Sequence, residues 1–221
     1  MRALIFMDTI KMQRLRNFLY PLLKQYTYLR QTISWQQRNF ASPAPEYVKR
    51  RTLLRNQFHN LPWIETGTYK GDTTAFLAVN SPGVFTIEPS EKYYLQALAR
   101  FANNSKVQVI QGSSEEILED LIMSLKSGLN FWLDGHFSGG ETFLGSSLTP
   151  IITELKIIDK IFNQTDFKFM VAVDDIRLFK GSTSHESGYP ELKSLVDWAE
   201  ENNYQWHIEH DIFFAIRNLN S

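Results

Sequence analysis

The spacing of hydrophobic residues changes at about residue 60. Between residues 9 and 40 they recur every three or four positions, which is typical of an amphipathic helix. Pro21 interrupts this pattern, so we expect the helix to be kinked or divided there. Ser42-Pro43-Ala44-Pro45 predicts an extended linker, and a short helix is expected from Glu46 to about Asn56.

From Leu61 onward, short runs of β-forming residues alternate with helical stretches. This alternation predicts a doubly wound, mostly parallel sheet with helices on both faces. Strands are expected over residues 63–65, 84–88, 107–111, 129–134 and 167–174, and helices over residues 72–80, 90–103, 113–126, 147–163 and 190–202. Residues 204–209 and 212–217 are predicted to be two strands joined by a tight turn, which makes the last strand antiparallel and brings the sheet to seven strands. The chain therefore divides into a helical arm with its linker, residues 1–58, and an α/β domain, residues 59–221.

Charge follows the same division. Residues 1–60 hold 11 of the 23 Lys and Arg residues but only two of the 24 acidic residues, Asp8 and Glu46. The remaining 12 basic and 22 acidic residues give the α/β domain a net charge of -10, which argues against a nucleic-acid-binding surface there. The basic arm has three alternative roles: a packing element or homo-oligomer contact, a lid over the substrate, or peripheral contact with a membrane.

Other features of the composition limit the cellular setting. The sequence has no cysteine, hence no disulfide and no thiolate metal site, and the cytoplasm is the simplest expectation. No apolar run approaches the roughly 18 residues of a transmembrane segment. Arg2 and Asp8 within the first ten residues argue against a cleaved signal peptide.

The first candidate motif lies where the first predicted strand passes into a helix. Glu65, Gly67, Thr68 and Gly71 belong to the stretch Glu-Thr-Gly-Thr-Tyr-Lys-Gly, whose glycines allow the backbone to approach a ligand closely. The stretch is neither a Walker loop nor a dinucleotide fingerprint. Its leading carboxylate would repel a pyrophosphate but suits the ammonium and sulfonium charges of S-adenosylmethionine, which favours that cofactor over NAD. An ordinary glycine turn is the alternative.

Two further residues follow at the ends of the next strands. Glu88 ends the second predicted strand, at about the spacing at which such folds present an acid to ribose hydroxyls. The alternative for Glu88 is an acid at a helix N-terminus. Ser113 follows the third strand, where an adenine ring would lie, although it is equally suited to cap the next helix.

Three acidic residues end the fourth and fifth predicted strands, which we expect to be neighbours. Asp134, Asp174 and Asp175 would then converge, and carboxylates crowded at a sheet edge are costly unless protonated or neutralised. Mg²⁺ is a suitable counter-ion and has open positions for the hydroxyls of a substrate. Asp134 or His136 would then take the proton from the substrate. Alternatively, Asp174 and Asp175 are a helix cap and a solvated acid, and no metal is bound. The alternative for His136 is a structural role.

These residues resemble the class I S-adenosylmethionine-dependent methyltransferases, through Glu65-x-Gly67-x-x-x-Gly71, Glu88, Asp134 and the terminal hairpin. The resemblance covers about residues 60–218 and implies a Rossmann-like fold. The acidic pattern is most similar to that of the metal-dependent macrocin-type sugar and catechol O-methyltransferases, which implies Mg²⁺ held by Asp134, Asp174 and Asp175. The Asp134-Gly135-His136 loop departs from the sugar-methylating enzymes, which leaves the acceptor open.

The sequence therefore predicts an S-adenosylmethionine-dependent O-methyltransferase acting on a small molecule. A saccharide or other polyol is the first expectation for that molecule and a phenol the second. The first alternative is a non-catalytic module that binds S-adenosylmethionine or a nucleoside and acts through its basic arm. The second is a sugar-nucleotide or NAD-linked enzyme, which the acid at Glu65 disfavours.

Overall fold

The computed structural model describes residues 22–134, 149–180 and 189–218. The chain divides into two compact units, Met1–Val48 and Lys49–Ser221. In the first unit, residues 22–37 form a helix, as expected, whereas Pro21 and the residues before it lie outside the described part. Within the described residues, no helix has the length and apolar character needed to cross a membrane.

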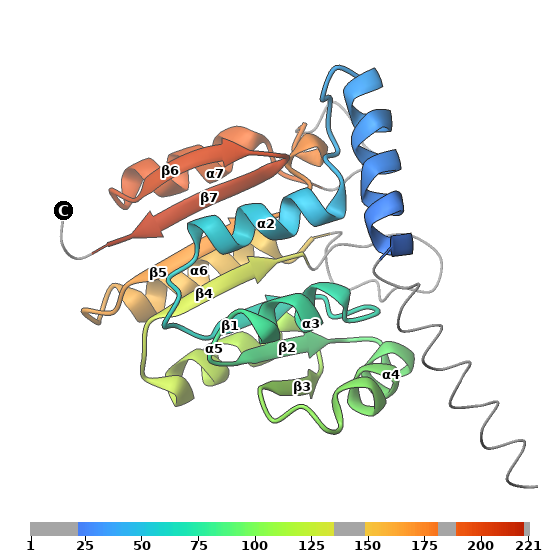
Figure 1. The fold of residues 1–221 in the computed structure, drawn as a ribbon. Helices are drawn as coiled ribbons and strands as arrows, with labels where there is room; N and C mark the ends of the chain where they lie inside the picture. Colours follow the sequence, from blue (N-terminus) through green and yellow to red (C-terminus); the bar gives the residue numbers. More distant parts are fainter. Residues whose placement is uncertain (1–21, 135–148, 181–188, 219–221) are drawn as a thin grey trace, which may run out of the picture. The chain divides into compact units, whose positions relative to one another are not determined.

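The second unit is built on a seven-stranded sheet with the order β3-β2-β1-β4-β5-β7-β6 (Figure 1). All neighbouring strands are parallel except β7, which runs antiparallel to both β5 and β6. This confirms the predicted mostly parallel sheet and its C-terminal hairpin. The strands are β1 (Trp63–Thr66), β2 (Val84–Glu88), β3 (Val107–Gln111), β4 (Leu129–Leu133), β5 (Phe169–Val173), β6 (Gln205–Glu209) and β7 (Ile212–Arg217).

Helices connect the parallel strands, as the alternating pattern predicts. Their observed ends lie within a few residues of the predicted ones. Helix α2 (Glu46–Asn56) precedes β1. The helices between strands are α3 (Asp72–Val79), α4 (Glu91–Phe101), α5 (Ser114–Leu125), α6 (Ile151–Phe162) and α7 (Leu192–Glu201), with a short 3-10 helix, η1 (Ile176–Leu178), that the sequence did not indicate.

The two faces of the sheet are both covered, so its central strands are buried throughout. On one face, α5, α6 and α7 pack against alternate strand residues such as Phe131, whose ring lies edge-on to Phe162 and Phe169. On the other face, Leu53 of α2 and Leu77 of α3 pack around Trp63, Trp132 and Phe214. Figure 1 shows α2 and α3 on the face opposite to α5 and α6.

This topology brings the carboxyl ends of four strands together. Thr66 of β1 pairs in register with Ile87 of β2 and with Leu133 of β4, and Leu133 pairs with Val173 of β5. The residues that follow these strands therefore share one edge of the sheet. In open α/β sheets, ligands bind outside this edge, where the strand order reverses.

The aromatic packing on the α5–α6 face gives a stability prediction. Phe131→Ala should lower the free energy of unfolding by about 3–5 kcal/mol, because the fully buried ring leaves a cavity between Phe162 and Phe169. Phe167→Ala is the control, since Phe167 is already 37% exposed. Urea denaturation of both variants would measure the difference, and an equal loss in the two would contradict the assigned core.

Candidate functional site

The β1–α3 turn holds the predicted glycine motif in an unusual backbone conformation. Gly67 has φ 90° and Gly71 has φ 74°, in the left-handed region that favours glycine. A Cβ on Gly71 would also lie 2.7 Å from the ring of Phe101. Both glycines are thus required by the turn itself, which then leads directly into α3.

Glu88 lies against this turn. Its Oε2 accepts a hydrogen bond from the backbone N–H of Tyr69 at 2.7 Å, and its Oε1 accepts one from the N–H of Ser90 at 2.9 Å. Burial raises the pKa of Glu88 above its ordinary value, and the backbone N–H groups of Tyr69, Ser90 and Thr68 oppose that rise. Each carboxylate oxygen has about two acceptor positions, so the Glu88 carboxylate can accept further hydrogen bonds.

Glu65 is more deeply buried than its position at a strand end suggests. Its Oε2 accepts hydrogen bonds from the hydroxyls of Thr74 in α3 and of Thr86 in β2, the second at 2.7 Å. Thr68 is linked to the same group, because its hydroxyl lies 2.6 Å from that of Thr86. Burial raises the pKa of Glu65 to about 7, even though the two threonine hydroxyls lower it. Glu65 therefore ties β1, β2 and α3 together around the turn.

Ser113 stands directly before α5 in extended conformation. Its side chain makes no capping hydrogen bond to the helix, which weakens the alternative of helix capping. The preceding Gly112 has φ 138°, and a Cβ there would clash with Ile117 at 2.4 Å. The Gly112–Ser113 corner is thus fixed by packing, and the Ser113 hydroxyl is not used by its own helix.

The structure brings Asp134, Asp174 and Asp175 to one stretch of the sheet edge. The N–H of Asp134 donates to the Thr66 carbonyl at 3.1 Å, and the N–H of Asp174 donates to the Leu133 carbonyl at 3.2 Å. The charge of Asp134 contributes to raising the pKa of Asp174, after the larger effect of burial. The predicted convergence of these carboxylates is therefore observed.

Their neutralising cation is a side chain that the sequence did not single out. The Nζ of Lys49 in α2 donates to Asp174 Oδ1 at 2.6 Å and to Asp175 Oδ1 at 2.7 Å, and the Lys49 side chain is only 3% exposed. Burial by itself would lower the pKa of Lys49, but the charges of Asp174 and Asp175 outweigh it and raise the pKa above its ordinary value. Lys49 therefore remains protonated between the two carboxylates.

A second cation extends this network to the terminal hairpin. Arg177 of η1 is paired with Asp175 and with Asp211, which lies in the β6–β7 turn. The Lys49 Nζ is also 4.0 Å from Asp211 Oδ2. Burial alone would raise the pKa of Asp175, but Arg177 and Lys49 lower it. Two cations thus pair with three carboxylates. The pKa of Asp174 is nevertheless raised, first by burial and then by the charge of Asp134.

The expected Mg²⁺ site is not supported. Among the residues with described positions, no group of three or more His, Asp or Glu side chains is arranged to hold a metal ion. The oxygens of Asp174 and Asp175 that would ligate a metal instead accept hydrogen bonds from Lys49. A lysine ammonium satisfies the same need for charge compensation, so the acidic pattern alone did not distinguish the two solutions.

The sequence did not single out two polar residues near the site, the partly buried Tyr189 and the buried Glu154. Burial and the charges of Asp175, Asp134 and Asp174 raise the pKa of Tyr189, whose hydroxyl has no hydrogen-bond partner among the described atoms. Glu154 of α6 is fully buried. Burial raises its pKa to about 7, although the nearby Ser114 and Thr66 hydroxyls lower it. Neither residue stands in a motif, and only packing reveals their position.

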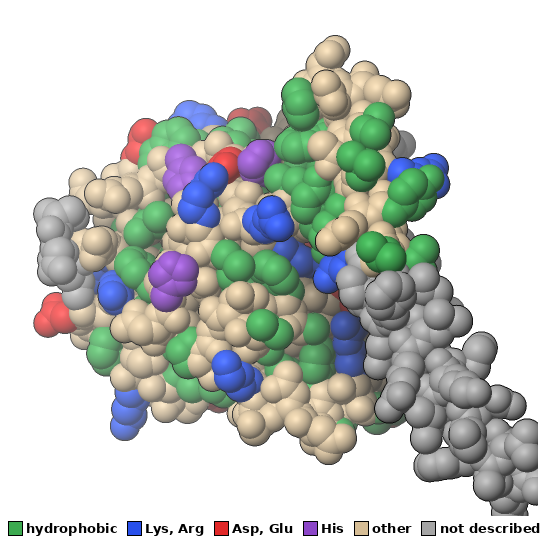
Figure 2. All heavy atoms as spheres, viewed as in Figure 1, with side chains coloured by type: hydrophobic (Ala, Val, Ile, Leu, Met, Phe, Trp, Pro, Cys, Tyr) green, Lys and Arg blue, Asp and Glu red, His purple; other side chains and the backbone are tan. Residues whose placement is uncertain are grey.

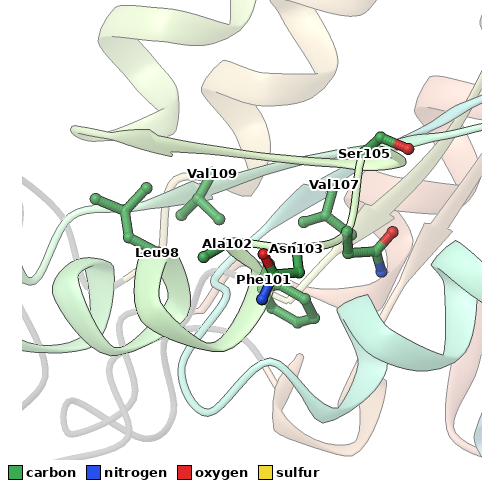
Figure 3. A pocket seen from close by; sticks show the side chains of 8 residues that line it. Leu98, Phe101, Ala102, Asn103, Ser105, Val107 and Val109 are labelled. Carbon is green, nitrogen blue, oxygen red and sulfur yellow. The ribbon is translucent and has the colours of Figure 1, made fainter.

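His136, the other candidate base, lies outside the described residues, as do the other residues from 135 to 148. A pocket of about 510 Å³ occurs elsewhere, between the end of α4 and the edge strand β3. Figure 3 shows it lined by side chains such as Leu98, Phe101 and Val109. It contains no ionisable residue and none of the predicted site residues, so we do not assign the chemistry to it.

Comparisons with known proteins establish the fold. No protein-family model matches the chain, and no curated protein matches it in sequence. The solved structure of the N-methyltransferase NodS from Bradyrhizobium japonicum WM9 matches with a TM-score of 0.50 and 12% identity, over 77% of this chain and 94% of that chain. A putative rRNA-methylase from Clostridium thermocellum matches with a TM-score of 0.49 and 12% identity, over 76% and 93% of the two chains. A putative methyltransferase from Streptococcus mutans in complex with SAH has a TM-score of 0.47 and 14% identity, over 78% and 96%.

The likeness to NodS supports the Rossmann-like methyltransferase fold that the sequence predicts. At 12% identity it does not extend to substrate or mechanism. The resemblance to sugar and catechol O-methyltransferases is not confirmed by these structures. The expectation that the chain does not bind nucleic acid stays a prediction.

The buried ion pairs give a second stability prediction. Lys49→Met should lower the free energy of unfolding by about 3–5 kcal/mol at neutral pH, because it leaves buried carboxylates without a counter-ion. Removing Lys49 raises the pKa of these carboxylates in the folded state. The folded variant then binds more protons than the unfolded variant. The stability that Lys49→Met loses relative to the unaltered chain should therefore shrink as the pH falls.

Lys160→Met is the matched control, since Lys160 forms an exposed ion pair with Glu119. Its loss should be about 0–1 kcal/mol. Urea denaturation at several pH values would measure both variants. The prediction fails if Lys49→Met loses little free energy of unfolding, or if that loss does not depend on pH. Either result would show that Lys49 is not the main source of charge compensation for Asp174 and Asp175.

Proposed function

We propose that the chain is an S-adenosylmethionine-dependent methyltransferase. The observation that carries this proposal is the hydrogen bond between Glu88 and the N–H of Tyr69, which joins an acidic acceptor at the end of β2 to the glycine turn after β1. On a methyltransferase fold, this is the edge of the sheet where strand order reverses and where a nucleoside would bind.

The residues present fit the chemistry of that cofactor. Glu88 retains acceptor positions for a vicinal pair of ribose hydroxyls, and Gly67 and Gly71 allow the turn to approach the ligand. Thr68 lies in the same turn, and Ser113 has a hydroxyl that its helix does not use. We infer that Glu88 and the turn bind the cofactor and that Ser113 faces its base.

The acidic residues around β1 would supply the electrostatic part of the binding. Burial raises the pKa of Glu65 to about 7, and the charge of Asp134 adds to this rise, so the group is partly protonated near pH 7. A cationic ligand near the turn would favour the ionised form of Glu65 and so lower its pKa. Glu65 then acts as a buried counter-charge, and the threonine hydroxyls hold it in place.

For the second substrate, we propose a small molecule that presents a hydroxyl group. A saccharide or other polyol is the first candidate and a phenol the second. The cofactor, when bound, supplies an electrophilic methyl group on a positively charged sulfur. Asp134 would accept the proton that the attacking hydroxyl loses, and His136 is the alternative base from the sequence. Burial raises the pKa of the Tyr189 hydroxyl, and the charges of Asp175 and Asp134 raise it further, which places Asp134 near Tyr189. Both side chains can hydrogen-bond a hydroxyl-rich molecule. Lys49 supplies the charge compensation for which a metal was expected, so no metal is part of this proposal.

Cofactor binding tests the proposal directly. In calorimetric titrations with S-adenosylhomocysteine, Glu88→Gln should weaken binding at least tenfold, since it removes the charge that strengthens hydrogen bonds from ribose hydroxyls. Glu91→Gln is the matched control, because it removes an exposed charge three residues away on α4. Binding by the unaltered chain should be the same in Mg²⁺ and in EDTA.

Absence of binding by the unaltered chain, to either S-adenosylmethionine or S-adenosylhomocysteine, would refute the proposed function. Thermal unfolding of Glu88→Gln without ligand would separate loss of the binding site from loss of the turn, which Glu88 also supports. Binding without methyl transfer to any hydroxyl acceptor would favour the non-catalytic module instead.

The raised pKa of Glu65 predicts a pH dependence. Below its pKa of about 7, Glu65 is mostly protonated and must lose a proton before it can serve as a counter-charge for the cationic cofactor. The affinity for S-adenosylmethionine should therefore fall as the pH drops from about 8 to about 6. S-adenosylhomocysteine lacks the sulfonium charge and should show a weaker dependence. Titrations of both ligands would measure the ratio of affinities, and Glu65→Gln should make that ratio independent of pH. A constant ratio in the unaltered chain would contradict the role given to Glu65.

A further inference from the structure

The helix of residues 22–37 has a narrow apolar stripe on its surface. Leu22, Tyr26, Leu29 and Ile33 follow one another at spacings of four, three and four residues, which places them on one side of an α-helix. Their exposed fractions are 53%, 59%, 57% and 45%. Figure 2 shows hydrophobic side chains, in green, along this helix, which is the blue helix of Figure 1.

The packing of the first unit uses a different side of the same helix. The ring of Tyr28 stacks on that of Tyr47 with centroids 4.3 Å apart, and the hydroxyl of Thr32 is hydrogen-bonded to that of Tyr47. Trp35 packs edge-on against Phe40. The internal contacts of this unit thus fix the side bearing Tyr28 and Thr32 and leave the stripe at the surface.

The charged residues of this segment are all basic, and one of them, Arg30, lies over the ring of Tyr26 in the stripe. Between Leu22 and Pro45 the sequence contains Lys24, Arg30 and Arg38 and no acidic residue. Over residues 1–45 as a whole there are seven basic residues and a single acid, Asp8. An occupant of this surface must therefore be apolar where it meets the stripe and negatively charged around it.

We propose that this helix docks on an anionic lipid surface, with the stripe inserted among the acyl chains at the interface and the basic residues near the headgroups. A bilayer with anionic lipids offers both an apolar phase and negative charge, which are the two features that such a helix requires. Pairing with a second copy of the chain would bring two positively charged arms together. Nucleic acid would satisfy the charge but leave the stripe in water. This proposal does not depend on the chemistry at the sheet edge.

Vesicle sedimentation with the full chain tests the proposal. The chain should pellet with phosphatidylcholine vesicles that contain one third phosphatidylglycerol, and should stay in solution with vesicles of phosphatidylcholine alone. High salt should weaken the binding. Leu29→Glu should lower the bound fraction at least tenfold. Gln31→Glu is the matched control, because it adds the same charge at an exposed position on the opposite side of the helix, and it should retain most of the binding.

Three results would overturn the proposal. The first is failure of the unaltered chain to bind the anionic vesicles. The second is an equal loss in Leu29→Glu and Gln31→Glu, which would mean that charge alone binds and the stripe has no part. The third is a dimer in light scattering that Leu29→Glu dissociates, which would assign the stripe to self-association. Circular dichroism of both variants would verify that the helix is retained.

Discussion

The ammonium group of Lys49 compensates charge that the parallel sheet concentrates at the carboxyl ends of its strands. Asp134, Asp174 and Asp175 follow neighbouring strands, so they share one edge and their charges interact. Burial makes that repulsion more costly, because the low-polarity interior screens it less than water does. Lys49 and Arg177 bring the positive charge from α2 and η1. The same contacts fix α2, β5 and the β6–β7 turn to one another, so charge compensation and tertiary structure depend on the same atoms.

The carboxylates of β1 and β2 are stabilised in a different way. Glu65 and Glu88 accept hydrogen bonds from threonine hydroxyls and backbone N–H groups, which are neutral donors. Neutral donors do not cancel the charge, so burial still raises the pKa of both acids. Near β5, the charges at the sheet edge are therefore largely paired. Near β1 and β2, the carboxylates can still bind a cation or accept hydrogen bonds from hydroxyl groups. This difference supports placing the cofactor at β1 and β2.

Opposite charges are also separated along the chain. The arm is basic, and the α/β domain from Leu61 onward is acidic. The acidic domain suits a cationic cofactor, whereas the arm suits an anionic surface. The two proposals thus rest on different residues and on different parts of one charge distribution, and either can hold without the other.

The sequence by itself determined most of the fold and the local part of the candidate site. Strand and helix periodicities lie within short windows, so the seven strands, their connecting helices and the terminal hairpin could be read from them. The Gly67–Gly71 turn and Glu88 follow from the same local patterns. Only the tertiary structure decided how the acids are neutralised. Lys49 and Asp174 are 125 residues apart, and in the sequence Lys49 is one of several basic residues on a short helix. Its burial, and that of Glu154 and Tyr189, results from packing between distant elements, which no local pattern encodes.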